Sequence, residues 1–340
     1  MSQLRASPQI HKLASDLGIK IKKDDDPVSA LLKYCERRVK AMMEGVTDFA
    51  NLSQMLDWIA NKVGTSFEVI YSDDDLQRIK QKYLAQREAA FVRLEDEFTG
   101  GVFGVTFKLQ HCESWEPQYV SIIDCRGDKA ARGYFTKWYE IAHLLTQTEQ
   151  LRLVFRRTHS SVNHGDPEER LMDVIAGRFG FYPPFVRSFI KEEISFEAIE
   201  NLRAQLCPEA SQQSSLINFT KCWNSPCILL LAEMGLRKGE EAQLNQGGFY
   251  FADASEHALR AVRVSPNDLA REHNFAIYEN MRVPERSVIK RVFTGEFVYD
   301  EAEEDLSWWE SSSGRSLKAR RIKVKARWWM QGVEVLIIPI

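Results

Sequence analysis

The sequence predicts an α+β protein of two domains, a helical domain with a small sheet followed by a smaller β-rich α/β domain. Apolar residues recur at helical spacing over 28–64, whereas segments 228–234, 319–329 and 333–338 are strand-like. A polar, linker-like stretch over 208–215 lies between these two patterns. At 340 residues the chain is long enough for two domains of ordinary size.

The first domain, expected over 28–207, follows a polar segment of mixed charge over 1–27 that predicts a loose arm. Residues 28–64 predict a pair of helices, and 67–71 predict a short strand. A long charged helix is expected over 73–94, because the acidic cluster at its start suits the positive end of the helix dipole.

The rest of this domain predicts more strands and helices. Residues 101–109 and 119–124 alternate or run β-branched and apolar, so they predict strands that form a small sheet. An apolar helix is expected around 138–145. Further elements are expected in chain order: a strand at 151–157, then helices at 167–179, 184–192 and 195–206.

The second domain is expected over 226–340, after a linker over 208–225. Its predicted strands are 228–234, 258–264, 288–298, 319–329 and 333–338. A short helix is expected after 265–268, where Asn267 can cap it.

The chemical signal lies at residues 138–143, Trp-Tyr-Glu-Ile-Ala-His, one residue away from His-Glu-x-x-His. That motif places two imidazoles one helical turn apart on the same face, where both reach one zinc ion. Its glutamate acts on the metal-bound water. Glu140 and His143 are in place here, but Tyr139 stands where the first histidine would be.

The segments on both sides of this motif also carry recognisable sequence features. Residues 131–136 read Ala-Arg-Gly-Tyr-Phe-Thr, the segment 166–176 follows about one helix later, and 181–184 read Phe-Tyr-Pro-Pro. Over 130–184 the chain resembles the ImmA/IrrE family of bacterial zinc metallopeptidases. The resemblance implies a zincin-like fold and a peptidase that cleaves a specific regulatory protein in a stress or phage response.

The resemblance also implies roles for individual residues. His143 would be a zinc ligand, Glu140 the general base and Glu169 the third ligand. Asp173, four residues further along the same helix face, would hydrogen-bond a ligand histidine and set its tautomer. Glu168 is a neighbouring candidate, but the spacing from Glu169 to Asp173 places ligand and orienting group on one face.

Each of these residues also has an ordinary structural interpretation. His143 could be a core histidine, and Glu140 a buried helix carboxylate that needs a partner. Glu168 and Glu169 could simply favour the N-terminus of their helix.

Tyr139 replaces the first histidine of the motif and should weaken zinc binding, because a phenol with a pKa of about 10 is a poor ligand at neutral pH. We therefore expect weak or absent zinc and an impaired or inactive enzyme. Tyr139 could instead fill the metal pocket with its ring. His159 or His164, between the two motif helices, could replace the missing ligand.

Charge is segregated near the C-terminus. Residues 300–305 are acidic, and 318–327 are basic with two-residue alternation. This pattern predicts either a hairpin whose basic strand faces the acidic segment or a docking surface for nucleic acid or an acidic partner. Tryptophans flank the strip and could stack on bases or on a protein: Trp308, Trp309, Trp328 and Trp329.

Composition and charge limit the kinds of partner and the compartment that the sequence predicts. A formal net charge of −3 does not predict nucleic-acid binding, and no apolar run is long enough for a membrane span. Six cysteines without a CxxC pair indicate reduced thiols in the cytoplasm. Three classes remain: a peptidase acting on a protein substrate, a catalytically dead peptidase fold that binds or senses a partner, and a nucleic-acid or assembly module.

Overall fold

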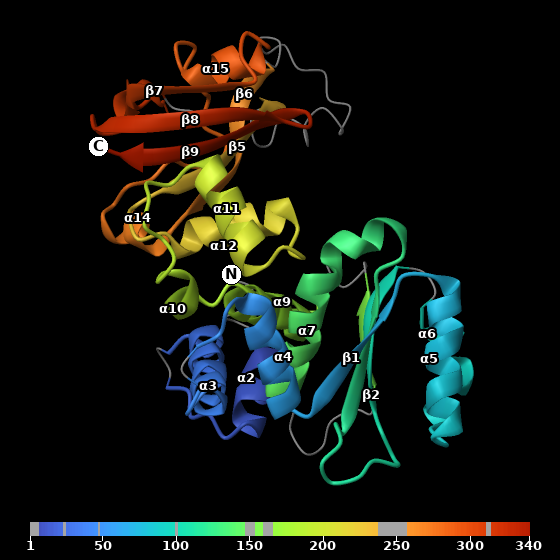
Figure 1. The fold of residues 1–340 in the computed structure, drawn as a ribbon. Coiled ribbons are helices and arrows are strands. Elements are labelled where there is room, and N and C mark those ends of the chain that lie inside the picture. The colour runs from blue at the N-terminus through green and yellow to red at the C-terminus, as the bar shows by residue number, and fades with distance from the viewer. Residues whose placement is uncertain are drawn as a thin grey trace, which may run out of the picture. The chain divides into compact units, whose positions relative to one another are not determined.

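The computed structural model describes residues 7–22, 25–46, 48–98, 101–146, 154–158, 166–236, 257–310 and 314–340, with only the backbone over 154–158 (Figure 1). Helices and two separate sheets make the chain an α+β protein, as the sequence predicts. It forms two compact units. The first comprises Met1–Pro183 and Arg203–Gln212, and the second comprises Pro184–Leu202 and Gln213–Ile340.

The first unit opens with three helices, α2 (Pro8–Asp16), α3 (Pro27–Met42) and α4 (Leu52–Lys62). The segment expected to be a loose arm therefore contains a helix. Ile10, Leu13 and Ala14 recur at helical spacing on α2 and are buried, and burial of this apolar face stabilises the helix in spite of its polar surroundings.

The sheet of the first unit contains β1 (Thr65–Ile70), β2 (Val102–Lys108), β3 (Tyr119–Asp124) and β4 (Val154–Thr158), in the order β1-β3-β2-β4. Strand β1 runs parallel to β3, while β2 is antiparallel to both β3 and β4. Helix α7 (Gly133–Leu145) lies on one face and α5 (Asp73–Ala85) on the other (Figure 1).

Helix α5 is shorter than the sequence predicts. It begins with a capping box in which Ser72 and Asp75 each accept the other's backbone N–H. It ends at Ala85 because Arg87 has a φ of 64°, a left-handed conformation that ends a helix. A 3₁₀ turn (Ala89–Arg93) and α6 (Leu94–Glu97) follow. Aromatic rings join this layer to the sheet, since Phe91 packs between Tyr83 and Phe107 with centroid distances of 4.4 and 4.6 Å.

Three helices come before the sheet of the second unit. They are α10 (Pro183–Val186), α11 (Phe196–Leu206), of which only the start belongs to this unit, and α12 (Gln212–Cys222). The predicted linker over 208–225 is thus largely helical. Leu216, Phe219 and Cys222 are buried on α12, at the i, i+3, i+6 spacing of one helix face, in a segment whose serines and glutamines had suggested a loop.

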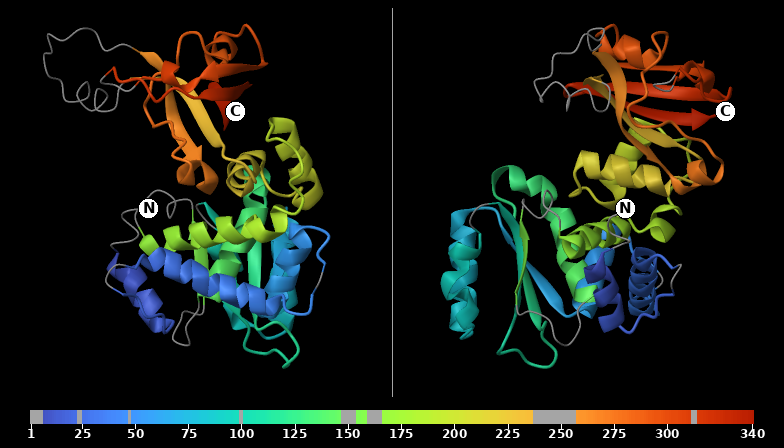
Figure 2. Two further views of the ribbon diagram at one scale, coloured as in Figure 1. Left: turned by 90° about the vertical axis from the view of Figure 1, so that its left-hand side faces the viewer. Right: turned by 180° about the vertical axis from the view of Figure 1, so that it is seen from behind.

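A five-stranded antiparallel sheet forms the core of the second unit. Its strands β5 (Ile228–Gly235), β6 (Ala258–Pro266), β7 (Tyr299–Asp305), β8 (Arg321–Trp329) and β9 (Gly332–Pro339) lie in the order β6-β5-β9-β8-β7. Figure 2 shows this sheet from two further sides. The predicted strands at 228–234, 258–264, 319–329 and 333–338 are confirmed, as is α14 (Asp268–Glu272), capped by Asn267.

The predicted strand at 288–298 is wrong. Residues Val288–Phe293 form helix α15, whose N-cap Ser287 accepts the backbone N–H of Ile289. Val288, Ile289 and Val292 are β-branched, which suggested a strand, but their spacing also matches one face of a helix, and all three are buried against the sheet.

Candidate active site

Helix α7 carries the sequence motif and is buried on nearly every side. Tyr134 ties it to helix α9 (Pro167–Gly180), because its hydroxyl donates to the carbonyl of Gly180 at 2.6 Å. On α9, Asp166 caps the first turn by accepting the backbone N–H of Glu168, and Pro167 occupies the first helical position. The two motif segments therefore form two helices of the first unit that pack on each other.

Tyr139 and His143 lie one turn apart on the same face of α7, as their spacing predicts. Their ring centroids are 4.9 Å apart in an edge-to-face arrangement. The Tyr139 side chain is 1% exposed, so its ring occupies the position next to His143 from within the core. That the phenol fills a former metal pocket stays a prediction.

Glu169 on α9 faces His143 on α7. Glu169 Oε1 lies 3.8 Å from His143 Nε2, close to the roughly 3.4 Å that separates two ligands on one tetrahedral zinc. The other oxygen, Glu169 Oε2, is buried and makes no hydrogen bond within the described part of the chain. Burial, and secondarily the charge of Asp173, raises the pKa of Glu169 to about 7.

The preference for Glu169 over Glu168 agrees with this contact, since it is Glu169 that meets His143. Asp173 lies close enough to Glu169 to raise its pKa. A hydrogen bond from a ligand histidine to Asp173 stays a prediction.

Glu140 lies on the sheet-facing side of α7 and is fully buried. Its Oε2 accepts a hydrogen bond of 2.7 Å from Thr106 Oγ1 on β2. Thr106 in turn lies 2.6 Å from Ser121 Oγ on β3. The carboxylate therefore has the partner that its burial requires.

Thr106, Ser121 and Gly104 surround Glu140 but were not predicted from the sequence. A Cβ on Gly104 would lie 2.8 Å from Glu140 Oε1 and 2.7 Å from Thr136 Cγ2, so a larger residue would force these side chains or the helix to shift. A signal was present, because Gly104 and Thr106 alternate with bulky apolar residues on β2 and thus share one face of the sheet.

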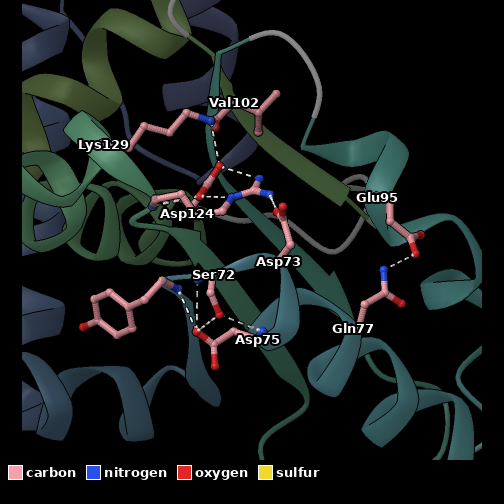
Figure 3. A network of polar contacts seen from close by, with 10 residues as sticks. Ser72, Asp73, Asp75, Gln77, Glu95, Val102, Asp124 and Lys129 are labelled. Atoms are coloured by element: carbon pink, nitrogen blue, oxygen red, sulfur yellow. Dashed lines mark hydrogen bonds and ion pairs between the residues drawn. The ribbon is translucent and has the colours of Figure 1, made fainter.

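The polar network in Figure 3 holds the segment that leads into α7. Asp124, the buried last residue of β3, accepts from Arg126 Nε at 2.9 Å and from Lys129 Nζ at 2.7 Å. Lys129 also donates to the carbonyl of Val102, and Arg126 donates to Asp73. Burial raises the pKa of Asp124, but hydrogen bonds from Arg126 and Lys129 outweigh it and leave the pKa below its ordinary value.

The described residues bring two of the predicted zinc donors together. His143 and Glu169 offer two donors, and among described residues no group of three or more histidine, cysteine or acidic side chains could hold a metal ion. A catalytic zinc site has three protein ligands. His159 and His164, the candidates for a replacement ligand, lie outside the described residues.

The basic segment 318–327 pairs with the acidic one. Strand β8 lies beside β7 with Lys323 opposite Glu303 and Lys325 opposite Glu301. Lys325 Nζ donates to the carbonyl of Ile194 at 2.8 Å and lies 3.2 Å from Glu193. This is the hairpin that the sequence offered as one alternative.

Two basic side chains and one ring of this region are also engaged within the second unit. Arg327 lies 2.8 Å from Glu334. Lys323 lies 3.3 Å from Glu193. Trp309 is fully buried in the core, so it cannot stack on bases. These contacts give no support to the nucleic-acid alternative.

No protein-family model matches this chain, and no curated protein has a significant similarity to it. None of the helices in the described ranges combines the length and apolarity needed to cross a bilayer.

Proposed function

We propose that the first unit is a zincin-like metallopeptidase domain, similar to the ImmA/IrrE proteases, whose hydrolytic site is disabled at one zinc ligand. One observation carries this proposal: His143 and Glu169 face each other at 3.8 Å, while Tyr139 is buried beside His143 where the first histidine of the motif would stand. This contact supports the proposal, because the resemblance implies that these two residues bind the same zinc ion.

The side chains that can donate to a metal determine whether such a site can hydrolyse a peptide bond. Zinc, where three protein ligands hold it, polarises a peptide carbonyl and activates water. Here an imidazole and a carboxylate are the two suitable donors, and the third position holds a phenol. We expect weak zinc binding and little or no peptide hydrolysis. The partner or former substrate would be a regulatory protein.

A second candidate is a peptidase fold kept purely as a binding or sensing domain. The complete burial of Tyr139 favours it, because a ring packed into the core stabilises the fold and is not an idle remnant. The two candidates differ in whether a histidine at position 139 would restore peptide hydrolysis.

The test is zinc content by elemental analysis of the natural chain and of the Tyr139→His variant, after dialysis against zinc and then metal-free buffer. We expect zinc near one per chain only in the histidine variant. A Tyr139→Phe variant is the control, since it changes the same position without adding a donor. Equal zinc content in the natural chain and the histidine variant would refute the assignment of ligands.

Hydrolysis separates the two candidates. The histidine variant loaded with zinc is incubated with an unstructured protein such as casein, and cleavage is followed by mass spectrometry. Cleavage that disappears with Glu140→Gln supports a peptidase disabled at one ligand. Full zinc without cleavage supports the binding domain.

A further inference from the structure

A row of three hydroxyl groups crosses the sheet of the first unit beneath α7. Thr106 on β2 lies opposite Ser121 on β3 in the strand register, and their oxygens are 2.6 Å apart. Thr65 on β1 lies 3.0 Å from Ser121. All three side chains are buried, and the row ends at Glu140 Oε2, 2.7 Å from Thr106.

The hydrogen bonds of this row all run in one direction when the row ends at a carboxylate, which can only accept. Each hydroxyl carries a single proton. Thr106 uses its one proton in the hydrogen bond that it donates to Glu140, so in the contact with Ser121 it accepts and Ser121 donates. Thr65 then donates to Ser121 at 3.0 Å in preference to the carbonyl of Ser66 at 3.4 Å. Three consecutive donors all point toward Glu140, and hydrogen bonds in such a chain strengthen one another.

The other side of the carboxylate is confined by backbone. Glu140 Oε1 lies where a Cβ of residue 104 would come within 2.8 Å, so the glycine leaves space for this oxygen. Thr136, one turn before Glu140 on α7, closes the same space with its methyl group. The carboxyl group is thus held on one oxygen by a hydroxyl and enclosed on the other by strand β2.

We infer that Thr106 is a positioning residue for Glu140, and that Ser121 and Thr65 orient the Thr106 hydroxyl toward the carboxylate. A general base works only when its carboxylate is held in a productive orientation by groups whose own orientations are determined. This catalytic consequence rests on the proposed function. The positioning itself rests on the geometry of the buried row.

Infrared difference spectroscopy tests the positioning in the natural chain. The spectrum of Glu140→Gln subtracted from that of the natural protein isolates the Glu140 carboxyl band. We expect Thr106→Val to shift this band to that of a carboxyl group with one hydrogen bond fewer. Thr106→Ser should restore it. Thr220→Val is the matched control, because it removes another buried hydroxyl that donates to a backbone carbonyl, that of Leu216.

Two results would overturn the inference: an unchanged band in Thr106→Val, or an equal shift in Thr106→Val and Thr220→Val. If Thr106→Val fails to fold, Ser121→Ala decides instead. It leaves the Thr106 hydroxyl in place but removes its donor, and we expect a smaller shift in the same direction. An unchanged band in Ser121→Ala would count against the role of the row.

The catalytic consequence is measured in the Tyr139→His background. We expect Thr106→Val to leave the zinc content unchanged and to lower the turnover of casein at least tenfold, with most of the turnover regained in Thr106→Ser. Unchanged turnover in Thr106→Val overturns the catalytic consequence. If Tyr139→His gains no zinc, the proposed function fails, and the infrared result still decides whether Thr106 positions Glu140.

Discussion

His143 Nε2 on helix α7 lies 3.8 Å from Glu169 Oε1 on helix α9. The two residues belong to separate sequence motifs, and each side chain is less than a quarter exposed. The packing of α7 against α9, tied by Tyr134 and the carbonyl of Gly180, brings an imidazole and a carboxylate together at a distance suited to a shared cation.

Glu169→Gln in the Tyr139→His background should abolish the gain in zinc. The amide oxygen is a weaker ligand than a carboxylate, and affinity should fall by more than the roughly 10–100-fold that loss of an outer-shell partner costs. Competition with a chromophoric chelator measures the affinity. Glu168→Gln is the matched control, and a larger effect at Glu168 would mean that the ligand had been assigned to the wrong glutamate.

Gly104→Ala should destabilise the first unit by about 1–3 kcal/mol, because the new methyl group meets Glu140 Oε1 and Thr136 Cγ2 below van der Waals distance. Gly235→Ala, in the strand β5, meets nothing within 4 Å and should be nearly neutral. Urea unfolding of both variants measures the difference. Equal stabilities would show that α7 can move away from the sheet without cost.

Asp124→Asn should lower the free energy of unfolding by about 2 kcal/mol at pH 7, since the hydrogen bonds from Arg126 and Lys129 lose their charged acceptor. The pKa of Asp124 is depressed in the folded state. Its contribution is therefore complete above the unfolded-state pKa of about 4 and is lost as the pH falls through the lower folded-state value.

The same variant thus predicts a pH dependence. Between pH 7 and pH 3 the natural chain should lose more stability than Asp124→Asn, because the amide does not titrate. Urea unfolding at several pH values measures this. Parallel stability curves for the two proteins would contradict the assignment of a depressed pKa to Asp124.

Lys325→Met should cost the second unit about 1–3 kcal/mol, because the buried ammonium group satisfies the carbonyl of Ile194 and neutralises Glu193. Lys323→Met should cost less than about 1 kcal/mol, since its side chain is 30% exposed and its ion pairs are screened by solvent. Thermal unfolding compares the two, and equal losses would mean that the buried contact adds nothing.

The sequence predicted the elements whose pattern is local. Alternation located β2, β3 and β8, and a capping residue located α14 at Asn267. Local patterns gave the wrong secondary structure where the same residues suit both a strand and a helix. The β-branched run at 288–292 fits a strand or one face of a helix, and Ser287 with a sheet to pack against decided for the helix α15.

For the site, the sequence alone determined that Tyr139, Glu140 and His143 share a helix with the spacing of a metallopeptidase motif, because helical periodicity is a property of neighbours along the chain. Only the tertiary structure decided that Glu169 meets His143, and that Thr106, Ser121 and Gly104 surround Glu140. Those contacts depend on the register of the strands and on the packing of α7 between α9 and the sheet. Local spacing can place a residue on a face of its own strand or helix, but it does not determine which residue of another element lies opposite.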